Sequence, residues 1–193
     1  TFKINVIPLN PESKELLFEN KSVRIYSFPL KHRINTNGFI FEEKKNEKHI
    51  IREMIYFHKI PLNLIHDIKN GADYISPEGD VIKNDILTLP GSPAKKYAYC
   101  SDTAYAPEII KYIKNVNLLY HEATFAESEI KRAEETYHST AGQAARIAKM
   151  AEVKKLVIGH YSSRYSEIGL LLKEASQIFP ETELASEGKI FEI

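Results

Sequence analysis

The sequence lacks several features that by themselves assign a protein to a class: paired cysteines, an excess of one charge and a long apolar run. Its 193 residues include one cysteine, Cys100, so no internal disulfide can form and a reducing compartment is expected. Lys and Arg number 26, as do Asp and Glu, so the net charge is zero and gives no general signal of nucleic-acid binding. No apolar run approaches the roughly 18 residues needed to span a bilayer, and there is no signal-peptide pattern. These absences predict a cytoplasmic protein without membrane contact.

The spacing of apolar residues predicts one α/β domain over residues 1–193. Strands are expected at 2–8, 16–19, 23–28, 39–41, 96–100, 116–120, 153–158, 183–185 and 189–193. Helices are expected at 107–114, 127–135, 166–179 and from a capping box, Thr140 with Gln143, through Met150. Because the first forty residues hold only strands, whereas strands and helices alternate after residue 96, the sheet is expected to be mixed.

Residues 42–90 interrupt this pattern. The stretch starts with a run of charged residues, offers one short helix at 49–58, and is then broken by prolines, glycines and asparagines. It predicts a long excursion from the core, and such segments are usually functional or mobile.

Side chains that bind metals or transfer protons follow four of the predicted strands. They are His32, Asp102, the pair His121-Glu122, and His160, and His138 stands just before a helix. If these strand ends lie along one edge of the sheet, the side chains converge on one site. Imidazole and carboxylate without thiolate suit a catalytic zinc or manganese site, and two metals can generate hydroxide and clamp a phosphoryl group.

Each residue also has a simpler interpretation. A lone histidine at a strand end is more often structural, and an Asp-Thr pair after a strand is often only a helix cap. His121 could be a packed core residue, and Cys100 is most simply a small buried side chain. Spacing alone leaves both interpretations open.

Several short motifs resemble, in order, those of ribonuclease Z, the tRNA 3′-processing endonuclease family of the metallo-β-lactamase superfamily. They are Pro29-Leu30-Lys31-His32-Arg33 with Gly38-Phe39, Ser101-Asp102-Thr103, His121-Glu122-Ala123-Thr124-Phe125, His138-Ser139-Thr140 and His160-Tyr161-Ser162-Ser163-Arg164-Tyr165. The match covers nearly the whole chain. It implies the C-terminal part of an αββα metallo-β-lactamase sandwich with mixed β-sheets.

The resemblance also implies roles for single residues. His32 and His160 would be terminal ligands, one to each of two zinc ions, and Asp102 would bridge the ions. His138 would be the general acid that protonates the leaving 3′ oxygen, and Glu122 would orient its imidazole. Attack by metal-activated hydroxide would cleave precursor tRNA at its 3′ end and leave a 3′-hydroxyl on the tRNA.

The implied substrate contacts and partners lie outside this centre. Arg164 would contact phosphate or the acceptor end, and the 42–90 excursion would be an arm that grips the tRNA. The arm's lysines could contact phosphates without reading sequence; they are Lys44, Lys45, Lys48, Lys59 and Lys69. A homodimer is also implied.

Two features depart from the family pattern. The signature His-x-His-x-Asp-His is absent, and the chain begins at Thr1 without methionine, so we expect a C-terminal part whose missing N-terminal part supplies further ligands. Alone, the chain is expected to be inactive or nearly so. The arm also lacks the family's Gly-Pro pair and reads Ile60-Pro61-Leu62-Asn63-Leu64 at the corresponding place.

Two other functions remain open. One is a metallo-β-lactamase-fold hydrolase of small phosphodiesters or thioesters, although a positioned general acid better suits a poor alkoxide leaving group. The other is a non-catalytic RNA-binding subunit with a degenerate metal site. Retention of His32, Asp102, His138 and His160 together argues against that subunit.

Overall fold

The computed structural model describes residue 3, residues 5–44 and residues 47–193. The chain divides into two compact units, which we call the sheet unit (residues 1–43 and 95–193) and the inserted unit (residues 44–94). The inserted unit falls near the expected excursion at 42–90. Among the described residues, no helix combines the length and the apolar character needed to cross a bilayer.

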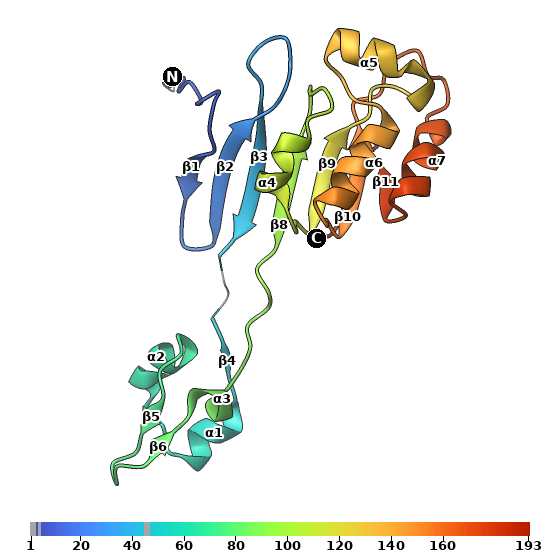
Figure 1. Cartoon of the computed structure of the whole chain (residues 1–193). Helices are drawn as coiled ribbons and strands as arrows, with labels where there is room; N and C mark the ends of the chain where they lie inside the picture. The colour runs from blue at the N-terminus through green and yellow to red at the C-terminus, as the bar shows by residue number, and fades with distance from the viewer. Residues whose placement is uncertain (1–2, 4, 45–46) are drawn as a thin grey trace. The chain divides into compact units, whose positions relative to one another are not determined.

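The sheet unit is built on one mixed sheet of seven strands (Figure 1). Their spatial order is β1 (Glu15–Glu19), β2 (Val23–Pro29), β3 (Asn37–Glu43), β8 (Lys96–Cys100), β9 (Leu118–Glu122), β10 (Lys155–Gly159) and β11 (Thr182–Leu184). The pairs from β1 to β8 are antiparallel, and those from β8 to β11 are parallel. The mixed sheet expected from the sequence is therefore confirmed.

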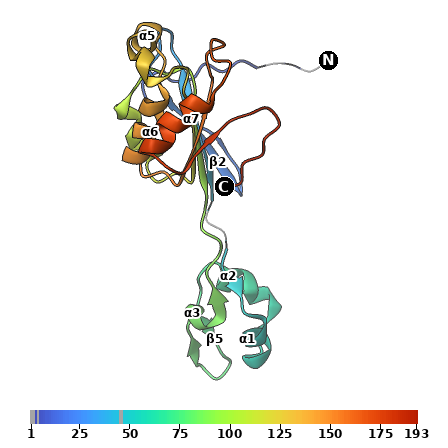
Figure 2. The same ribbon diagram turned by 90° about the vertical axis from the view of Figure 1, so that its right-hand side faces the viewer.

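Helices cover one face of this sheet (Figure 2). They are the 3-10 turn η2 (Pro107–Ile109), α4 (Ile110–Ile113), the 3-10 turn η3 (Glu127–Glu129), α5 (Ile130–Thr136), α6 (Ala141–Met150) and α7 (Gly169–Ile178). The core between helices and sheet is mostly aliphatic and includes Ile40, Ala98, Leu119, Ile147, Leu156, Ile158 and Leu171. The helix α6 starts at the predicted capping box: Thr140 Oγ1 accepts from the Gln143 amide at 3.1 Å, and Gln143 Oε1 accepts from the Thr140 amide at 2.9 Å.

Two expected strands do not form in the sheet unit. Residues 5–8 have no ladder partner, and Val6 and Ile7 are exposed, while Phe2 and Ile4 lie outside the described residues. Residues 189–193 also form no strand. Instead, Phe191 and Ile193 line a hollow of about 270 Å³ with Tyr97, Tyr120 and Val157. In the C-terminal segment, Phe191 and Ile193 therefore line a hollow instead of pairing as a strand.

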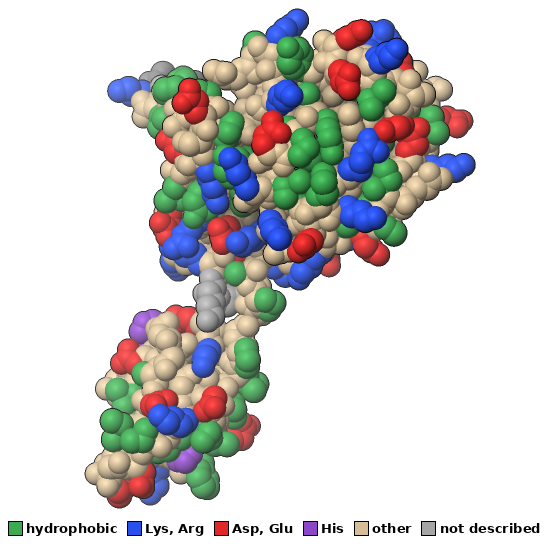
Figure 3. All heavy atoms as spheres, in the orientation of Figure 1, with side chains coloured by type: hydrophobic (Ala, Val, Ile, Leu, Met, Phe, Trp, Pro, Cys, Tyr) green, Lys and Arg blue, Asp and Glu red, His purple; other side chains and the backbone are tan. Residues whose placement is uncertain are grey.

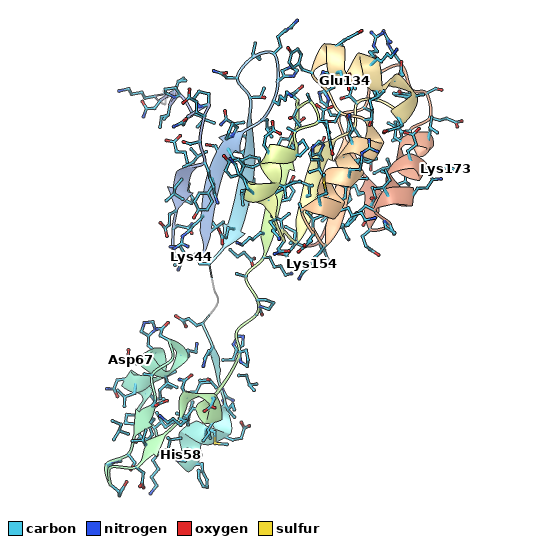
Figure 4. All side chains as sticks on the ribbon, in the orientation of Figure 1. Lys44, His58, Asp67, Glu134, Lys154 and Lys173 are labelled. Atoms are coloured by element: carbon cyan, nitrogen blue, oxygen red, sulfur yellow. The ribbon has the colours of Figure 1, made fainter. Side chains whose placement is uncertain are left out.

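The inserted unit has a small core of its own. It contains β4 (His49–Ile50), α1 (Arg52–Phe57), the 3-10 turn η1 (Leu62–Leu64), α2 (Ile65–Lys69), β5 (Tyr74–Ile75), β6 (Val81–Ile82), α3 (Asn84–Leu87) and β7 (Thr88–Leu89). Buried residues Ile60, Ile68, Tyr74 and Leu87 pack together. Figure 3 shows many hydrophobic side chains on the surface of this unit, where Tyr56, Phe57 and Leu62 are exposed. Figure 4 labels Asp67 on α2 and His58 just after α1.

The chain leaves and re-enters the sheet at neighbouring positions. Glu43 ends β3 and Lys96 begins β8, and these strands are antiparallel neighbours. The Glu43 amide donates to the Lys95 carbonyl at 2.9 Å, and the Lys95 amide donates to Glu43 Oε2 at 3.0 Å. The inserted unit therefore occupies the place of a turn between two paired strands.

Candidate metal centre

The candidate site lies at the carboxyl ends of the parallel strands. Asp102 follows β8, Glu122 ends β9, and His160 follows β10. Because these strands are parallel neighbours, their carboxyl ends meet at one edge of the sheet. In Figure 4, Glu134 on α5 marks the side of the sheet unit where this edge lies, and Lys154, just before β10, marks the opposite side.

The structure brings the sequence-predicted side chains together at this edge. Asp102, His138 and His160 each offer a ligand atom, and these atoms lie within 4.8 Å of one another. His160 Nε2 is 3.3 Å from Asp102 Oδ1. The His32 ring lies beside His138, with centroids 5.3 Å apart. The tightest group thus contains His138, to which the resemblance gives proton transfer, and has His32 as its neighbour.

Two of these side chains project from a left-handed backbone. The φ angle is 54° at Asp102 and 58° at His160, a region that residues with a Cβ rarely adopt. Gly159 stands before His160 for a different reason: a Cβ there would lie 2.3 Å from Tyr120 Oη. The backbone at the site therefore carries conformational strain that the surrounding contacts must hold.

Glu122 is the buried centre of the hydrogen-bond network. Its Oε1 accepts from the Thr103 amide at 2.6 Å and from His138 Nδ1 at 2.9 Å. Its Oε2 accepts from Thr124 Oγ1 at 2.6 Å and from the Ser139 amide at 3.0 Å. One carboxylate thus holds the loops that carry Asp102, His138 and His160.

Each histidine at the site uses Nδ1 for an internal contact. His32 Nδ1 lies 2.9 Å from the Tyr137 carbonyl oxygen, to which only a protonated nitrogen can bond. His138 Nδ1 faces Glu122, and His160 Nδ1 lies 2.9 Å from Thr124 Oγ1. This arrangement leaves Nε2 of each ring for other partners. Metal-binding histidines are commonly held in this way through their second nitrogen.

The Glu122–His138 pair favours its ionised form. Burial raises the pKa of Glu122, but the hydrogen bonds from His138, Ser139 and Thr124 outweigh it and hold that pKa below its ordinary value. The hydrogen bond to Glu122 raises the pKa of His138, against the opposing effect of burial. A protonated imidazole is therefore stabilised beside Asp102 and His160.

His121 and Cys100 belong to the core rather than to the site. Successive strand residues point to opposite faces, so His121 points away from the face that Glu122 occupies. Its ring is buried, its Nδ1 bonds to the Glu122 carbonyl at 2.8 Å, and burial lowers its pKa. Cys100 pairs in register with His121 and is also buried, which raises the pKa of its thiol. The simpler interpretation of both residues holds.

The remaining residues with expected contacts are Arg164 in the sheet unit and the lysines of the inserted unit. Arg164 is exposed, and among the described residues no carboxylate forms an ion pair with it. The neighbouring Tyr165 is structural: its hydroxyl accepts from the Ala126 amide at 2.8 Å and donates to Glu129 at 2.5 Å. In the inserted unit, Lys48 donates to Asn84 at 2.6 Å and Lys69 lies 3.7 Å from Glu47, while Lys45 falls outside the described residues.

Sequence reasoning assigned no role to the groups that orient the ligands. Thr103, Thr124 and Ser139 lie within the quoted motifs, and that position is the sequence feature from which a role could have been predicted. The Tyr137 carbonyl gave none, because any residue has a carbonyl and its position depends on the left-handed turn at Tyr137, with φ of 61°.

The sequence of this chain is similar to those of curated proteins named ribonuclease Z. No protein-family model matches the chain. A curated protein named ribonuclease Z from Bacteroides thetaiotaomicron is 56% identical over 179 residues, which cover 92% of this chain and 57% of that protein. Ribonuclease Z from Parabacteroides distasonis is 54% identical over 187 residues, 97% of this chain and 62% of that protein. The chain thus spans about three fifths of these relatives.

Solved structures show the same fold at lower identity. The metallo-β-lactamase fold protein YhfI from Bacillus subtilis superposes with a TM-score of 0.61 at 18% identity, covering 96% of this chain and 55% of that one. The short form of human tRNase Z superposes with a TM-score of 0.55 at 22% identity, covering 94% of this chain and 47% of that one. The resemblance noted in the motifs is confirmed: the chain has the metallo-β-lactamase fold, and over nearly its whole length its sequence is similar to curated proteins named ribonuclease Z.

Proposed function

We propose that this chain carries part of the active site of a metal-dependent endoribonuclease that cleaves precursor tRNA at its 3′ end. One observation carries the proposal: a histidine linked to a buried carboxylate, His138 with Glu122, lies within 4.8 Å of the Asp102–His160 pair. In the proposed roles, a proton donor would lie beside a metal-binding pair, an arrangement that suits phosphodiester cleavage with an alkoxide leaving group. The relatives named ribonuclease Z support the choice of RNA as substrate.

The donor set fits zinc. His32 and His160 keep Nε2 available because Nδ1 of each is engaged, and Asp102 is half-exposed at the same edge. Imidazole nitrogen and carboxylate oxygen are ordinary ligands of catalytic zinc. We propose two ions, with His32 and His160 as terminal ligands and Asp102 shared. Bound zinc would supply an activated water and neutralise charge on the phosphate.

In this proposal, His138 holds the proton that the leaving 3′ oxygen takes up. Its Nδ1 is fixed by Glu122 at 2.9 Å, so the proton to be transferred resides on Nε2. Glu122 is buried and ionised, which stabilises the charged imidazole before transfer and fixes the orientation of its ring. The product tRNA would then carry a 3′-hydroxyl.

The wider parts of the proposal concern the substrate and partners. Arg164 would contact phosphate near the acceptor end, and the inserted unit would serve as an arm for the tRNA. An N-terminal part of the same protein would supply the remaining zinc ligands. A homodimer and a cytoplasmic location also remain predictions.

The first experiment measures zinc per protein and cleavage of a precursor tRNA with a 3′ trailer. The 193-residue chain is compared with the longest natural form of the protein. Two metals with cleavage only in the longer form would support the proposal. Two metals without tRNA cleavage would favour hydrolysis of small esters, and no metal in either form would favour a non-catalytic RNA-binding subunit.

A further inference from the structure

We propose that Thr124 is a positioning residue, which links Glu122 to His160 and fixes which ring nitrogen His160 presents to a metal. Its hydroxyl lies 2.6 Å from Glu122 Oε2 and 2.9 Å from His160 Nδ1. The other groups that bond to the Glu122 carboxylate are the Thr103 amide, His138 Nδ1 and the Ser139 amide. Among the described residues, only Thr124 hydrogen-bonds with its side chain to both Glu122 and His160. The metal part of the inference rests on the proposed function, whereas the tautomer part does not.

The direction of the link follows from counting protons. A threonine hydroxyl has one proton and can donate it once. The ionised Glu122 can only accept, and its contact with Thr124 is short, so the hydroxyl proton points toward the carboxylate. The same oxygen must then accept from His160, which requires the proton of the neutral ring to be on Nδ1. The Nε2 lone pair is left free.

A competing arrangement exists in the same geometry. His160 Nε2 lies 3.3 Å from Asp102 Oδ1, so a proton on Nε2 could be donated to that carboxylate. This tautomer would have no lone pair facing the metal site. Thr124 opposes it, because a hydroxyl already committed to Glu122 has no proton to offer to a bare Nδ1.

The surroundings make the link strong. Thr124 is 6% exposed and Glu122 is fully buried, so water does not readily replace either partner. The loop itself is fixed by the Ser162 amide, which donates to the Thr124 carbonyl at 3.1 Å. Thr124 Oγ1 also lies 2.9 Å from the His160 carbonyl oxygen, a second acceptor for the hydroxyl proton. The charged Glu122 carboxylate at 2.6 Å is the stronger acceptor, because hydrogen bonds to ionised groups are shorter and stronger than those to neutral carbonyls.

The test compares Thr124→Val, Thr124→Ser and Thr88→Val in the longest natural form of the protein. Valine keeps the shape of threonine without its hydroxyl, and serine keeps the hydroxyl. Thr88 is the control, since it is also buried and donates a hydroxyl hydrogen bond, to the Asn84 carbonyl at 2.7 Å in the inserted unit. Nitrogen-15 NMR of the imidazoles in metal-free protein at pH 8 reads the tautomer of His160, and calorimetric zinc titration reads the affinity.

We expect the Nδ1–H tautomer of His160 in the wild type, in Thr124→Ser and in Thr88→Val. Thr124→Val should lose this preference and bind zinc about 10–100-fold more weakly, the usual loss for a residue that orients a ligand. An Nε2–H tautomer in the wild type, or an unchanged tautomer in Thr124→Val, would overturn the inference. If the wild type bound no zinc, the proposed metal centre would fail, and the tautomer measurement would still decide the role of Thr124.

Discussion

Because the backbone at Asp102 is left-handed, we expect a glycine substitution there to be more stable than an alanine substitution, the reverse of the usual order. Asp102→Ala and Asp102→Gly both remove the carboxylate and with it the proposed metal ligand. Alanine keeps a Cβ at φ of 54°, a conformation that costs roughly 1–2 kcal/mol, whereas glycine adopts it freely. Glycine in turn lowers the free energy of unfolding by roughly 0.5–1 kcal/mol, because the unfolded chain is more flexible at a glycine and loses more freedom on folding. The glycine variant should therefore be the more stable by about 0.5–1 kcal/mol.

Thermal unfolding of the metal-free variants measures this difference. A change of 1 kcal/mol shifts Tm by roughly 2–4 °C in a chain of this size, so the expected gap is about 1–4 °C. Glu152 is the matched control, because it has the same φ of 54° and only an exposed ion pair, 3.8 Å from Lys114. Glu135, exposed in α5, should show the opposite order, because glycine weakens a helix. An alanine variant of Asp102 as stable as the glycine variant would refute the argument.

Three further predictions concern other parts of the sheet unit. His138→Ala should lower cleavage by the longest natural form roughly 10²–10⁴-fold and leave its zinc content intact, and loss of zinc would show that His138 is a ligand instead. Burial lowers the pKa of His121, so the folded state should lose stability as the pH falls below 6.5, where the unfolded chain takes up a proton that the folded chain does not. Urea unfolding at pH 8 and pH 5.5 should show this loss, with a smaller loss in His121→Gln. Gly159→Ala should destabilise by roughly 1–3 kcal/mol, because the new Cβ would lie 2.3 Å from Tyr120 Oη; an unchanged urea midpoint would contradict this packing.

Local signals predicted those elements whose partners are near in sequence. The helix α6 begins at the position predicted from Thr140 and Gln143, because a capping box involves only two residues three positions apart. The strand β8 matches its predicted bounds: Ala98 and Cys100 are buried on one face, and Tyr97 and Tyr99 are half-buried on the other. Residues 189–193 were predicted as a strand, yet they have no ladder partner, and Phe191 lines a hollow with Tyr97, Tyr120 and Val157.

The site was predictable only in part for the same reason. Strand ends pointed to Asp102 and His160, because parallel topology alone brings such ends to one edge. The groups that orient them come from far away: Thr124 meets His160 across 36 residues, and the Tyr137 carbonyl meets His32 across 105. No local pattern encodes contacts at that separation.

The paired ends of β3 and β8 make the inserted unit exchangeable. Glu43 and Lys95 already bond to each other where the sheet unit closes, so the register from Phe39 with Tyr99 onward does not depend on what lies between them. A short hairpin turn could replace residues 44–94, and a longer or differently charged segment could be grafted there, without moving a residue of the candidate centre. Selection can therefore change the length and charge of the inserted unit independently of the candidate centre.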